Sequence, residues 1–107
     1  MVIPESQETI RLRELLGNCS FPTMPNLPDA RVASLEEMIE AQEQVKKYIE
    51  LSNVRLDCLD KVMHADDQPL AYEDLRLVTA AYNQAVDMQN DIAGSFNSQW
   101  AVFLEWN

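Results

Sequence analysis

The sequence predicts an all-α protein: a long antiparallel helical hairpin with a short amino-terminal helix and an extended proline-rich strap packed against it. The chain has 107 residues, which suits a single helical domain over 1–107 with one modest core. Four of its 5 prolines lie before position 30 and it has only 2 glycines, so the long remainder holds few helix breakers. In that remainder, apolar residues recur at alternating spacings of three and four, as in amphipathic helices.

The first expected element is a short helix over 5–16. Ile10, Leu15 and Leu16 fall roughly on one side of it, and glutamates lie near its start, where the helix dipole favours negative charge. Gly17 follows as a helix stop. We therefore place residues 1–18 in this helical segment.

The second expected element is an extended strap over 19–33. Pro22, Pro25 and Pro28 recur at every third position, which excludes a helix and favours a polyproline-like course. If the strap runs back along the first long helix, its apolar residues can pack on the hairpin. These residues are Phe21, Met24 and Leu27.

The first long helix is predicted over 34–65. Ser34 and Glu37 have the spacing of a capping box, in which each side chain bonds to the backbone N–H of the other residue. The turn-forming run that ends in Pro69 marks the stop. A coiled-coil-like seam is expected along Leu35, Met38, Gln42, Val45, Ile49, Ser52, Leu56, Leu59 and Met63.

The second long helix is predicted over 71–104. Glu73 and Asp74 fall in its first turn, where the dipole favours acids, and Gly94 is a weak point within it. Its expected seam comprises Leu75, Val78, Tyr82, Ala85, Gln89, Ile92, Phe96 and Phe103, with Trp100 beside it.

A connection of four or five residues makes the two long helices antiparallel neighbours, in which position i faces roughly position 136 minus i. This register sets Leu59 opposite Leu77 or Val78, Ile49 opposite Val86, and Leu35 and Met38 near Trp100 and Phe96. Two helices alone bury little surface, so the remaining apolar faces need a third layer, either the amino-terminal segment or a second copy of the chain. Those faces carry Ile39, Tyr48, Leu51, Val62, Val86 and Met88.

The charge of the chain restricts its partners. Eighteen acidic against eight basic residues give a formal charge of −10, which opposes binding to nucleic acids and to anionic membranes. Because the acids are scattered evenly, a solvated surface is a better explanation than mimicry of a nucleic acid. No apolar run of about 18 residues occurs, so we expect no direct membrane span.

Cys19 and Cys58 are the only cysteines, and no Cys-x-x-Cys motif occurs, which weakens a redox-active site and a zinc site. Free buried thiols or a single disulfide remain. The helix from Ser34 to Cys58 is about 36 Å long, and an extended strap covers up to about 50 Å, so the strap is long enough for Cys19 to reach Cys58. Such a bond would contribute roughly 3 to 4 kcal/mol through loop closure.

The pattern as a whole resembles small exported bacterial helical-hairpin proteins of unknown function, over roughly 19–103. The matching features are a proline-spaced strap, a helix with a Gln-x-x-Val-Lys core, a second matching helix and two cysteines. The matching residues are Cys19, Pro22, Pro25, Ser34, Glu37, Met38, Ala41, Gln42, Val45, Lys46, Tyr48, Cys58, Leu59, Tyr82, Asn83, Ala85, Val86, Phe96 and Asn97.

This resemblance implies a periplasmic or secreted location and a disulfide between Cys19 and Cys58, and it carries no activity. The 18 residues before Cys19 have no counterpart in it, and they show no secretory signal pattern. Two explanations stay open: a cytoplasmic protein, or an exported chain from which the signal was removed.

The sequence offers little catalytic chemistry. His64 is the only histidine, with Asp60, Asp66 and Asp67 near it, so a metal site at the hairpin tip is conceivable. A histidine in the last turn of a helix is, however, more simply explained by the helix dipole. Because phosphate-binding glycine motifs are also missing, we expect no catalytic, cofactor-binding or metal-binding residue, no cofactor and no enzymatic activity.

Two groups of residues could mediate recognition. The aromatic end is a candidate interaction surface, with packing against Leu35, Met38 and the strap as the alternative; it comprises Phe96, Trp100, Phe103 and Trp106. The polar seam residues could fix register or partner choice, although most are expected to face solvent. They are Gln42, Ser52, Asn83, Gln84, Gln89, Asn90 and Asn97.

The sequence thus favours a non-enzymatic structural or protein-interaction module of the bacterial cell envelope, with a protein partner or a homodimer as its assembly and no nucleic acid bound. The alternative is a cytosolic acidic inhibitor or adaptor, of phage type or mimicking a nucleic acid, that binds a basic protein surface and keeps both cysteines reduced.

Overall fold

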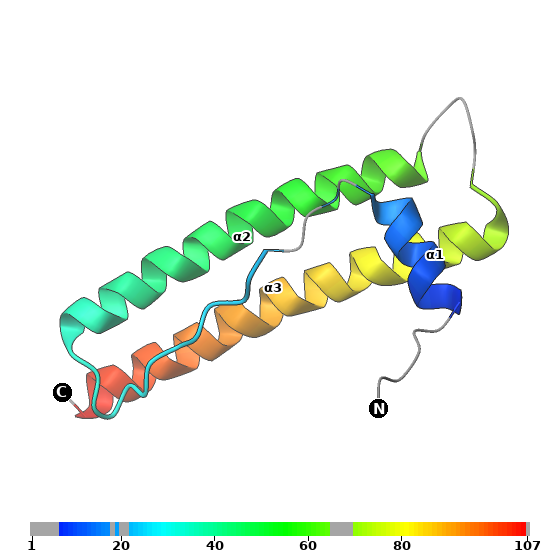
Figure 1. The fold of residues 1–107 in the computed structure, drawn as a ribbon. Coiled ribbons are helices and arrows are strands. Elements are labelled where there is room, and N and C mark those ends of the chain that lie inside the picture. The colour runs from blue at the N-terminus through cyan, green and yellow to red at the C-terminus, as the bar shows by residue number, and fades with distance from the viewer. Residues whose placement is uncertain (1–6, 18, 20–21, 65–69, 107) are drawn as a thin grey trace, which may run out of the picture.

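The computed structural model describes residues 7–17, 19, 22–64 and 70–106. It contains three helices, α1 (Gln7–Leu16), α2 (Leu35–Met63) and α3 (Tyr72–Trp106). Helices α2 and α3 pack along each other as a hairpin (Figure 1). The predicted all-α hairpin with a short amino-terminal helix is therefore confirmed.

Helix α1 ends where the sequence predicts. Gly17 adopts a φ of 41°, in the left-handed region that glycine enters without strain, and its N–H donates to the carbonyl of Arg13 at 3.1 Å. The buried face of α1 differs in part from the prediction: Leu16 is buried, but Ile10 is exposed and Leu12 packs in its place. Residues 5 and 6 of the predicted helix lie outside the described residues.

Helix α2 begins at the predicted capping box. The N–H of Glu37 donates to Ser34 Oγ and the N–H of Ser34 donates to Glu37 Oε1, both at 3.1 Å. The helix ends at Met63, with His64 as its carboxyl-terminal cap, two residues before the predicted end at 65. The turn-forming residues 66–69 that predicted this end lie outside the described residues. Helix α3 continues without a break through Gly94 to Trp106.

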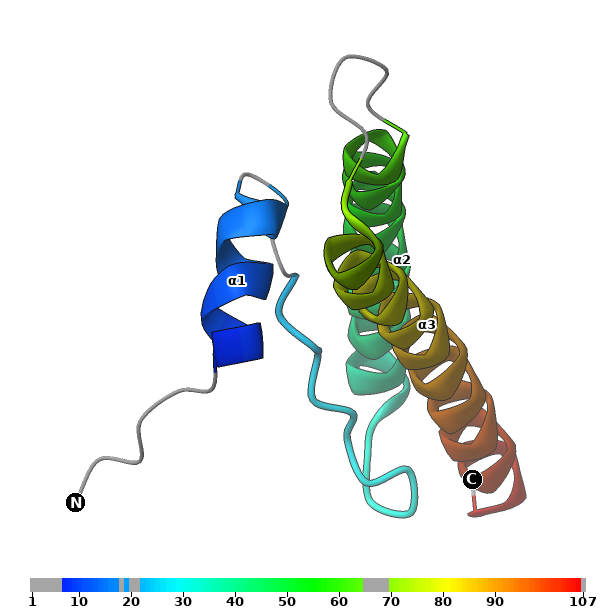
Figure 2. The ribbon, with the colours of Figure 1, turned by 90° about the vertical axis from the view of Figure 1, so that its right-hand side faces the viewer.

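The strap and α1 supply a third layer. Figure 2 shows both on one side of the α2–α3 pair, and in Figure 1 the strap follows the line between the two long helices. Met24 and Leu27 are half-buried against the hairpin, as predicted, whereas Phe21 lies outside the described residues. Of the two sources expected for a third layer, the amino-terminal segment therefore covers one face of the hairpin.

Buried side chains form two groups. The terminal cluster lies where α2 begins and α3 ends, and the disulfide cluster lies near the other end of the hairpin. The terminal cluster consists of Ala30, Ala33, Met38, Ala41, Val45, Tyr48, Ile92, Phe96 and Phe103. The disulfide cluster consists of Leu16, Cys19, Leu59, Val78 and Ala81.

The predicted seam of α2 is half right. Its positions Met38, Val45, Ser52 and Leu59 are buried. The alternate positions are wrong at Leu35 and Gln42, which are exposed. Ile49 and Met63 are half-buried against the terminal and disulfide clusters, and Leu56 is half-buried. The residues buried in their place are Ala41, Tyr48 and Arg55. The strap explains why other positions of α2 are buried. Helix α2 packs on the strap as well as on α3, so its buried residues face both neighbours.

On α3 most of the predicted seam is buried: Val78, Ala85, Ile92, Phe96 and Phe103. Leu75 is exposed, Tyr82 and Gln89 are half-buried, and Ala81 is buried although it was not expected to be. Ala81 belongs to the disulfide cluster, which also contains residues from the amino-terminal segment. Packing against that segment explains why a residue beside the seam becomes buried.

The register of the hairpin differs from the prediction. Gln89 Nε2 donates to Asn53 Oδ1 at 2.9 Å, and Thr79 Oγ1 lies 3.5 Å from Met63 Sδ, whereas the predicted register sets positions 83 and 73 there. The contacts are thus displaced by about six residues along α3, somewhat under two turns. The connection between the helices covers 64–71, which is longer than the four or five residues expected, so the register calculated from the shorter connection does not apply.

Candidate functional site

Cys19 and Cys58 form a disulfide, with their Cα atoms 5.6 Å apart. This confirms the predicted pairing and excludes the alternative of two free thiols. Cys19 is only 5 % exposed and belongs to the disulfide cluster with Leu16 and Leu59, whereas Cys58 is half-buried. The bond joins the chain between α1 and the strap to α2 at the disulfide cluster.

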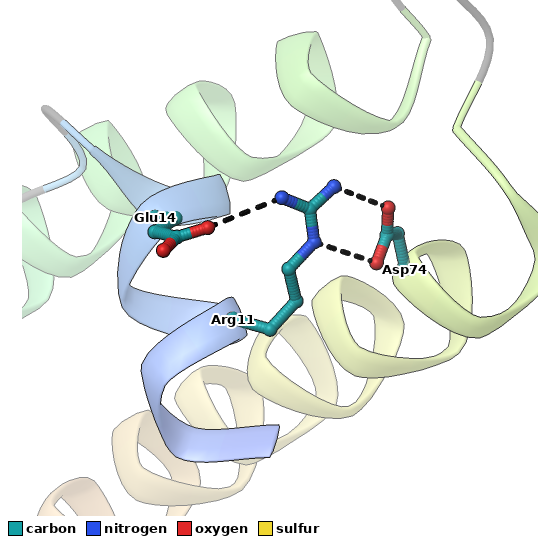
Figure 3. A network of polar contacts seen from close by, with 3 residues as sticks. All are labelled: Arg11, Glu14 and Asp74. Carbon is teal, nitrogen blue, oxygen red and sulfur yellow. Dashed lines mark hydrogen bonds and ion pairs between the residues drawn. The ribbon is translucent and has the colours of Figure 1, made fainter. Parts of the chain in front are cut away.

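A second link between α1 and the hairpin is an arginine fork, shown in Figure 3. Arg11 Nε donates to Asp74 Oδ1 at 3.0 Å and Arg11 Nη2 to Asp74 Oδ2 at 2.6 Å, while Nη1 donates to Glu14 Oε2 at 3.2 Å. Hydrogen bonds from Arg11 lower the pKa of Asp74, and those to Asp74 and Glu14 raise the pKa of Arg11. Sequence reasoning missed this pair, because 63 positions separate Arg11 from Asp74 and only the fold joins them.

Arg55 is a further residue that sequence reasoning missed. It is 3 % exposed in the middle of α2, and burial lowers the pKa of its guanidinium. It borders a cavity of about 20 Å³, which is lined by Pro22, Tyr48, Ser52, Arg55, Ala81, Gln84, Ala85 and Met88. That volume holds about one water molecule, so the cavity is too small for a substrate.

Two open hollows lie between the strap and α2, with volumes of about 340 and 310 Å³, and Gln44 borders both. The first is lined by Thr23, Met24, Pro25, Gln44, Lys47, Tyr48 and Leu51. The second is lined by Asn26, Leu27, Pro28, Glu37, Glu40, Ala41 and Gln44. The strap therefore covers α2 without filling the space beside it.

His64 acts as a helix cap. Its Nδ1 lies 3.0 Å from the carbonyl oxygen of Asp60 and 3.1 Å from Asp60 Oδ1, and the imidazole is largely exposed. Asp66 and Asp67, the other carboxylates considered for a tip metal site, lie outside the described residues. Within the described part of the chain, no group of three or more potential metal ligands occurs.

The predicted aromatic surface is divided between core and solvent. The Phe96 and Trp100 ring centroids lie 6.4 Å apart and those of Trp100 and Phe103 lie 5.6 Å apart, both pairs in stacked orientation. Phe96 and Phe103 are buried and Trp100 is half-buried against the terminal cluster, whereas Trp106 is exposed. Of the four residues, Trp106 is the one most accessible to a partner, and the interaction itself stays a prediction.

Exposed apolar side chains gather where the chain enters α2 and leaves α3. We call Val32, Leu35, Leu104 and Trp106 the end surface; they are 81 %, 53 %, 62 % and 63 % exposed. Figures 1 and 2 both show these segments at the same end of the hairpin. Ala30, Ala33, Val102 and Phe103 share the terminal cluster, which holds the two segments together.

Acidic residues accompany the end surface. Glu36 and Glu105 are exposed next to Leu35 and Leu104 in the chain, and the last turn of α3 contains no basic residue. The amino end of α2 and the carboxyl end of α3 carry opposite dipole charges, so the negative charge here comes from the two carboxylates. Part of the sequence signal was available, because Leu104 and Trp106 fall outside the predicted seam of the second long helix. Leu35 belongs to the predicted seam of the first long helix, so its exposure was not expected.

The polar residues predicted along the seam mostly face solvent, as expected. Ser52 is buried and Gln89 is half-buried with its side chain bonded to Asn53. The exposed members are Gln42, Asn83, Gln84, Asn90 and Asn97. Of this set, Gln89 makes a hydrogen bond across the two long helices, to Asn53 of α2.

None of the described helices is both long and apolar enough to cross a membrane. The disulfide suits a compartment outside the reducing cytoplasm, which is where most such bonds persist. Comparisons with protein-family models, with curated proteins and with solved structures find no match to this chain.

Proposed function

We propose that this chain is a non-enzymatic protein-interaction module of the bacterial cell envelope, and that it binds its partner through the end surface. The observation that carries the proposal is the exposure of Val32, Leu35, Leu104 and Trp106 at one end of the hairpin. Large apolar side chains left in water at one place are typical of interaction sites, and tryptophan is prominent among binding hot spots.

The partner's surface is expected to be apolar with basic residues around it. Glu36 and Glu105 flank the exposed apolar residues, and the chain as a whole carries a formal charge of −10. A basic rim would be attracted to these carboxylates, whereas a second copy of the chain would be repelled by them. We therefore favour a different protein over a homodimer as the partner.

The compartment is inferred from the disulfide. A single disulfide in a small chain is maintained where the surroundings are oxidising, as in the periplasm or outside the cell. The resemblance to small exported helical proteins points in the same direction. A module of this kind would work after export.

The alternative is a cytosolic acidic inhibitor or adaptor that binds a basic surface along its helices. Its support is that several basic side chains already pair with carboxylates within the chain, which leaves the acidic surface dominant. These pairs are Arg11–Asp74, Arg31–Asp29, Lys46–Glu43 and Arg76–Glu73.

A photo-crosslinking experiment tests the proposal. A photoreactive amino acid replaces Trp106 at the end surface or Val54, which is exposed in the middle of α2, and each protein is added to a bacterial envelope fraction. We expect one defined product from position 106 and none from position 54. The affinity of the isolated partner should then fall at least about tenfold for W106S, a typical hot-spot loss, and stay unchanged for V54S.

Salt separates the two proposals. Binding through an apolar contact should persist at high ionic strength, because apolar contacts are not screened. Binding that collapses with added salt and is indifferent to W106S would favour the acidic adaptor and contradict the end-surface proposal. Equal crosslinking from positions 106 and 54 would contradict it as well.

A further inference from the structure

We infer that the Cys19–Cys58 disulfide is a redox-operated latch: its cleavage by an external dithiol releases α1 and strap residues 22–28 from the hairpin. The turn at 29–33 and the two long helices stay folded. This device goes beyond the proposed docking function and does not depend on it, since the end surface lies at the other end of the hairpin from the bond.

The noncovalent hold on residues 22–28 is slight. Met24 and Leu27 are only half-buried, and Thr23 and Asn26 are exposed. Two open hollows of about 340 and 310 Å³ lie between these residues and α2, so this part of the strap borders solvent-filled space beside α2. A segment with so few buried contacts is held largely by what fastens its ends.

Helix α1 depends on the same bond. It has 10 residues, too few for a stable isolated helix, and its buried residue Leu16 packs in the cluster that contains Cys19. Its ion pair with α3 involves Arg11, which is half-exposed, so salt can screen it. Once Cys19 is no longer tied to Cys58, α1 loses the anchor next to its carboxyl end.

The segment after Pro28 is held in a different way. Ala30 is completely buried and its N–H donates to Gln99 Oε1 at 3.1 Å. The carbonyl of Asp29 accepts the N–H groups of Val32 and Ala33 at 3.1 and 2.9 Å, and the capping box of α2 follows directly. These bonds do not involve the disulfide, so we place the hinge between Pro28 and Asp29.

The exposure of the two cysteines sets the order of the chemistry. A thiolate of the dithiol attacks Sγ of half-buried Cys58, because Cys19 is the more deeply buried. The sulfur–sulfur bond breaks, Cys19 leaves as a thiolate and takes up a proton, and Cys58 is joined to the reductant. The second thiol of the reductant then displaces Cys58 as a thiol and closes the reductant's own disulfide.

Release uncovers a strip of the hairpin. Pro22 and Arg55 line the same small cavity, together with the buried residues Tyr48, Ala81 and Ala85. With the strap gone, an apolar strip that carries one guanidinium is presented on a chain whose surface is otherwise acidic. The oxidised form keeps this strip covered.

Hydrogen exchange of the full chain, oxidised and reduced with a small dithiol, tests the latch. We expect amides of α1 to lose protection on reduction, while those of α2, α3 and the Ala30 N–H keep theirs. Restoring the bond should restore protection. Unchanged protection of α1 would overturn the inference, and so would loss of protection throughout α2 and α3, since the bond would then support the whole fold.

Thiol alkylation gives an independent readout. In the reduced chain at equilibrium, Cys19 should react within about tenfold of its rate in urea, because an open latch exposes it. A Cys19 that reacts a thousandfold more slowly than in urea would show a latch that stays closed without its bond. In the variant C19A/C58A, the α1 amides should exchange hydrogen as fast as those of the reduced chain. In the control L104S, they should exchange as slowly as those of the oxidised wild type.

The direction of attack is tested by trapping. A protein dithiol of the Cys-x-x-Cys type, with its second cysteine replaced by serine, stops the reaction at the mixed disulfide. Peptide mapping should find the trapped protein on Cys58. Trapping mainly on Cys19 would overturn the proposed order of steps.

Discussion

Gly94 weakens α3, although the backbone conformation at this position does not require a glycine. It lies within α3, is exposed, and a Cβ built on it would meet no atom within 4 Å. Its backbone is helical, unlike that of Gly17, whose φ of 41° disfavours any side chain. The two glycines of the chain therefore make a matched pair for substitution.

We expect G94A to stabilise the protein by about 0.5 to 1 kcal/mol, because alanine loses less backbone entropy than glycine in a helix and has room here. Urea unfolding followed by circular dichroism measures the change in free energy. G17A should move the midpoint in the opposite direction. A destabilised G94A would show that α3 needs flexibility at this position.

The ion pair between Asp74 and Arg11 makes the docking of α1 on α3 sensitive to pH. The pKa of Asp74 is lowered from 3.8 by hydrogen bonds from Arg11 and by the charge of that residue. The folded-state pKa thus lies below the unfolded value, so the contribution is complete above about pH 3.8 and is lost as pH falls through the folded pKa. At neutral pH the pair is fully charged.

We therefore expect amides of α1 to exchange faster relative to those of α3 once the pH falls below 3.8. The measurement is hydrogen exchange of the oxidised chain, corrected for the intrinsic pH dependence of exchange. D74N should show the faster relative exchange already at neutral pH, with no further acid step. An identical acid step in D74N and wild type would assign the effect to another carboxylate.

At the scale of elements, the start of α2 is defined by local chemistry. Ser34 and Glu37 bond reciprocally, so two backbone N–H groups at the helix terminus are satisfied by side chains three positions apart. The preceding turn adds the bonds from Val32 and Ala33 to the carbonyl of Asp29. This makes the entry to α2 the best-fastened part of the strap.

Replacing Ser34 by alanine should lower the free energy of unfolding by about 1 kcal/mol, because the N–H of Glu37 loses its acceptor. Chemical denaturation measures this loss. S34D should retain most of the stability, since aspartate also caps helices well. Equal losses in S34A and S34D would indicate that the cap contributes little and that burial of Ala33 determines the entry.

The strap explains most of what sequence periodicity missed in the elements. A seam read from spacing assumes one neighbour, and α2 has two, so Ala41 and Arg55 are buried although they lie outside the predicted seam. Tyr48 is also buried, in agreement with its place on a face that was expected to need a third layer. Arg55 is also charged, and a search for apolar repeats passes over it. Arg55 and the strap residue Pro22 line the same small cavity, and a search for helix periodicity alone takes no account of the strap.

At the scale of the whole molecule, the third layer bears on assembly. The strap and α1 cover one face of the hairpin, and the principal dimensions of 55 × 40 × 18 Å describe a thin slab. The formal charge of −10 opposes contact between two copies. The strap and α1 of the same chain therefore supply the layer that a second copy of the chain could have supplied.

We therefore expect light scattering of the oxidised protein to give the monomer mass of 12.2 kDa at moderate salt. Raising the salt concentration tests whether charge repulsion alone prevents association. A species of twice this mass in moderate salt that W106S converts to monomer would identify the end surface as a dimer contact. That result would contradict the preference for a different protein as partner.

The sequence by itself determined the local features of this protein. Gly17, the Ser34–Glu37 cap, the proline-spaced strap and the two long helices depend on interactions within a few residues, and each was predicted. For the pairing of Cys19 with Cys58, chain length showed only that the strap is long enough, and the bond itself was what the resemblance to exported helical proteins implied.

Only the tertiary structure decided how these elements meet. The register of α3 against α2, the Arg11–Asp74 fork and the burial of Arg55 join residues far apart in the chain. Helical periodicity specifies which face of a helix is apolar. It does not determine how far one helix is shifted along the other, or which other segment of the chain covers the pair. The end surface also depends on this tertiary arrangement, since the strap covers one face of the hairpin and leaves Leu35 and Trp106 exposed to solvent.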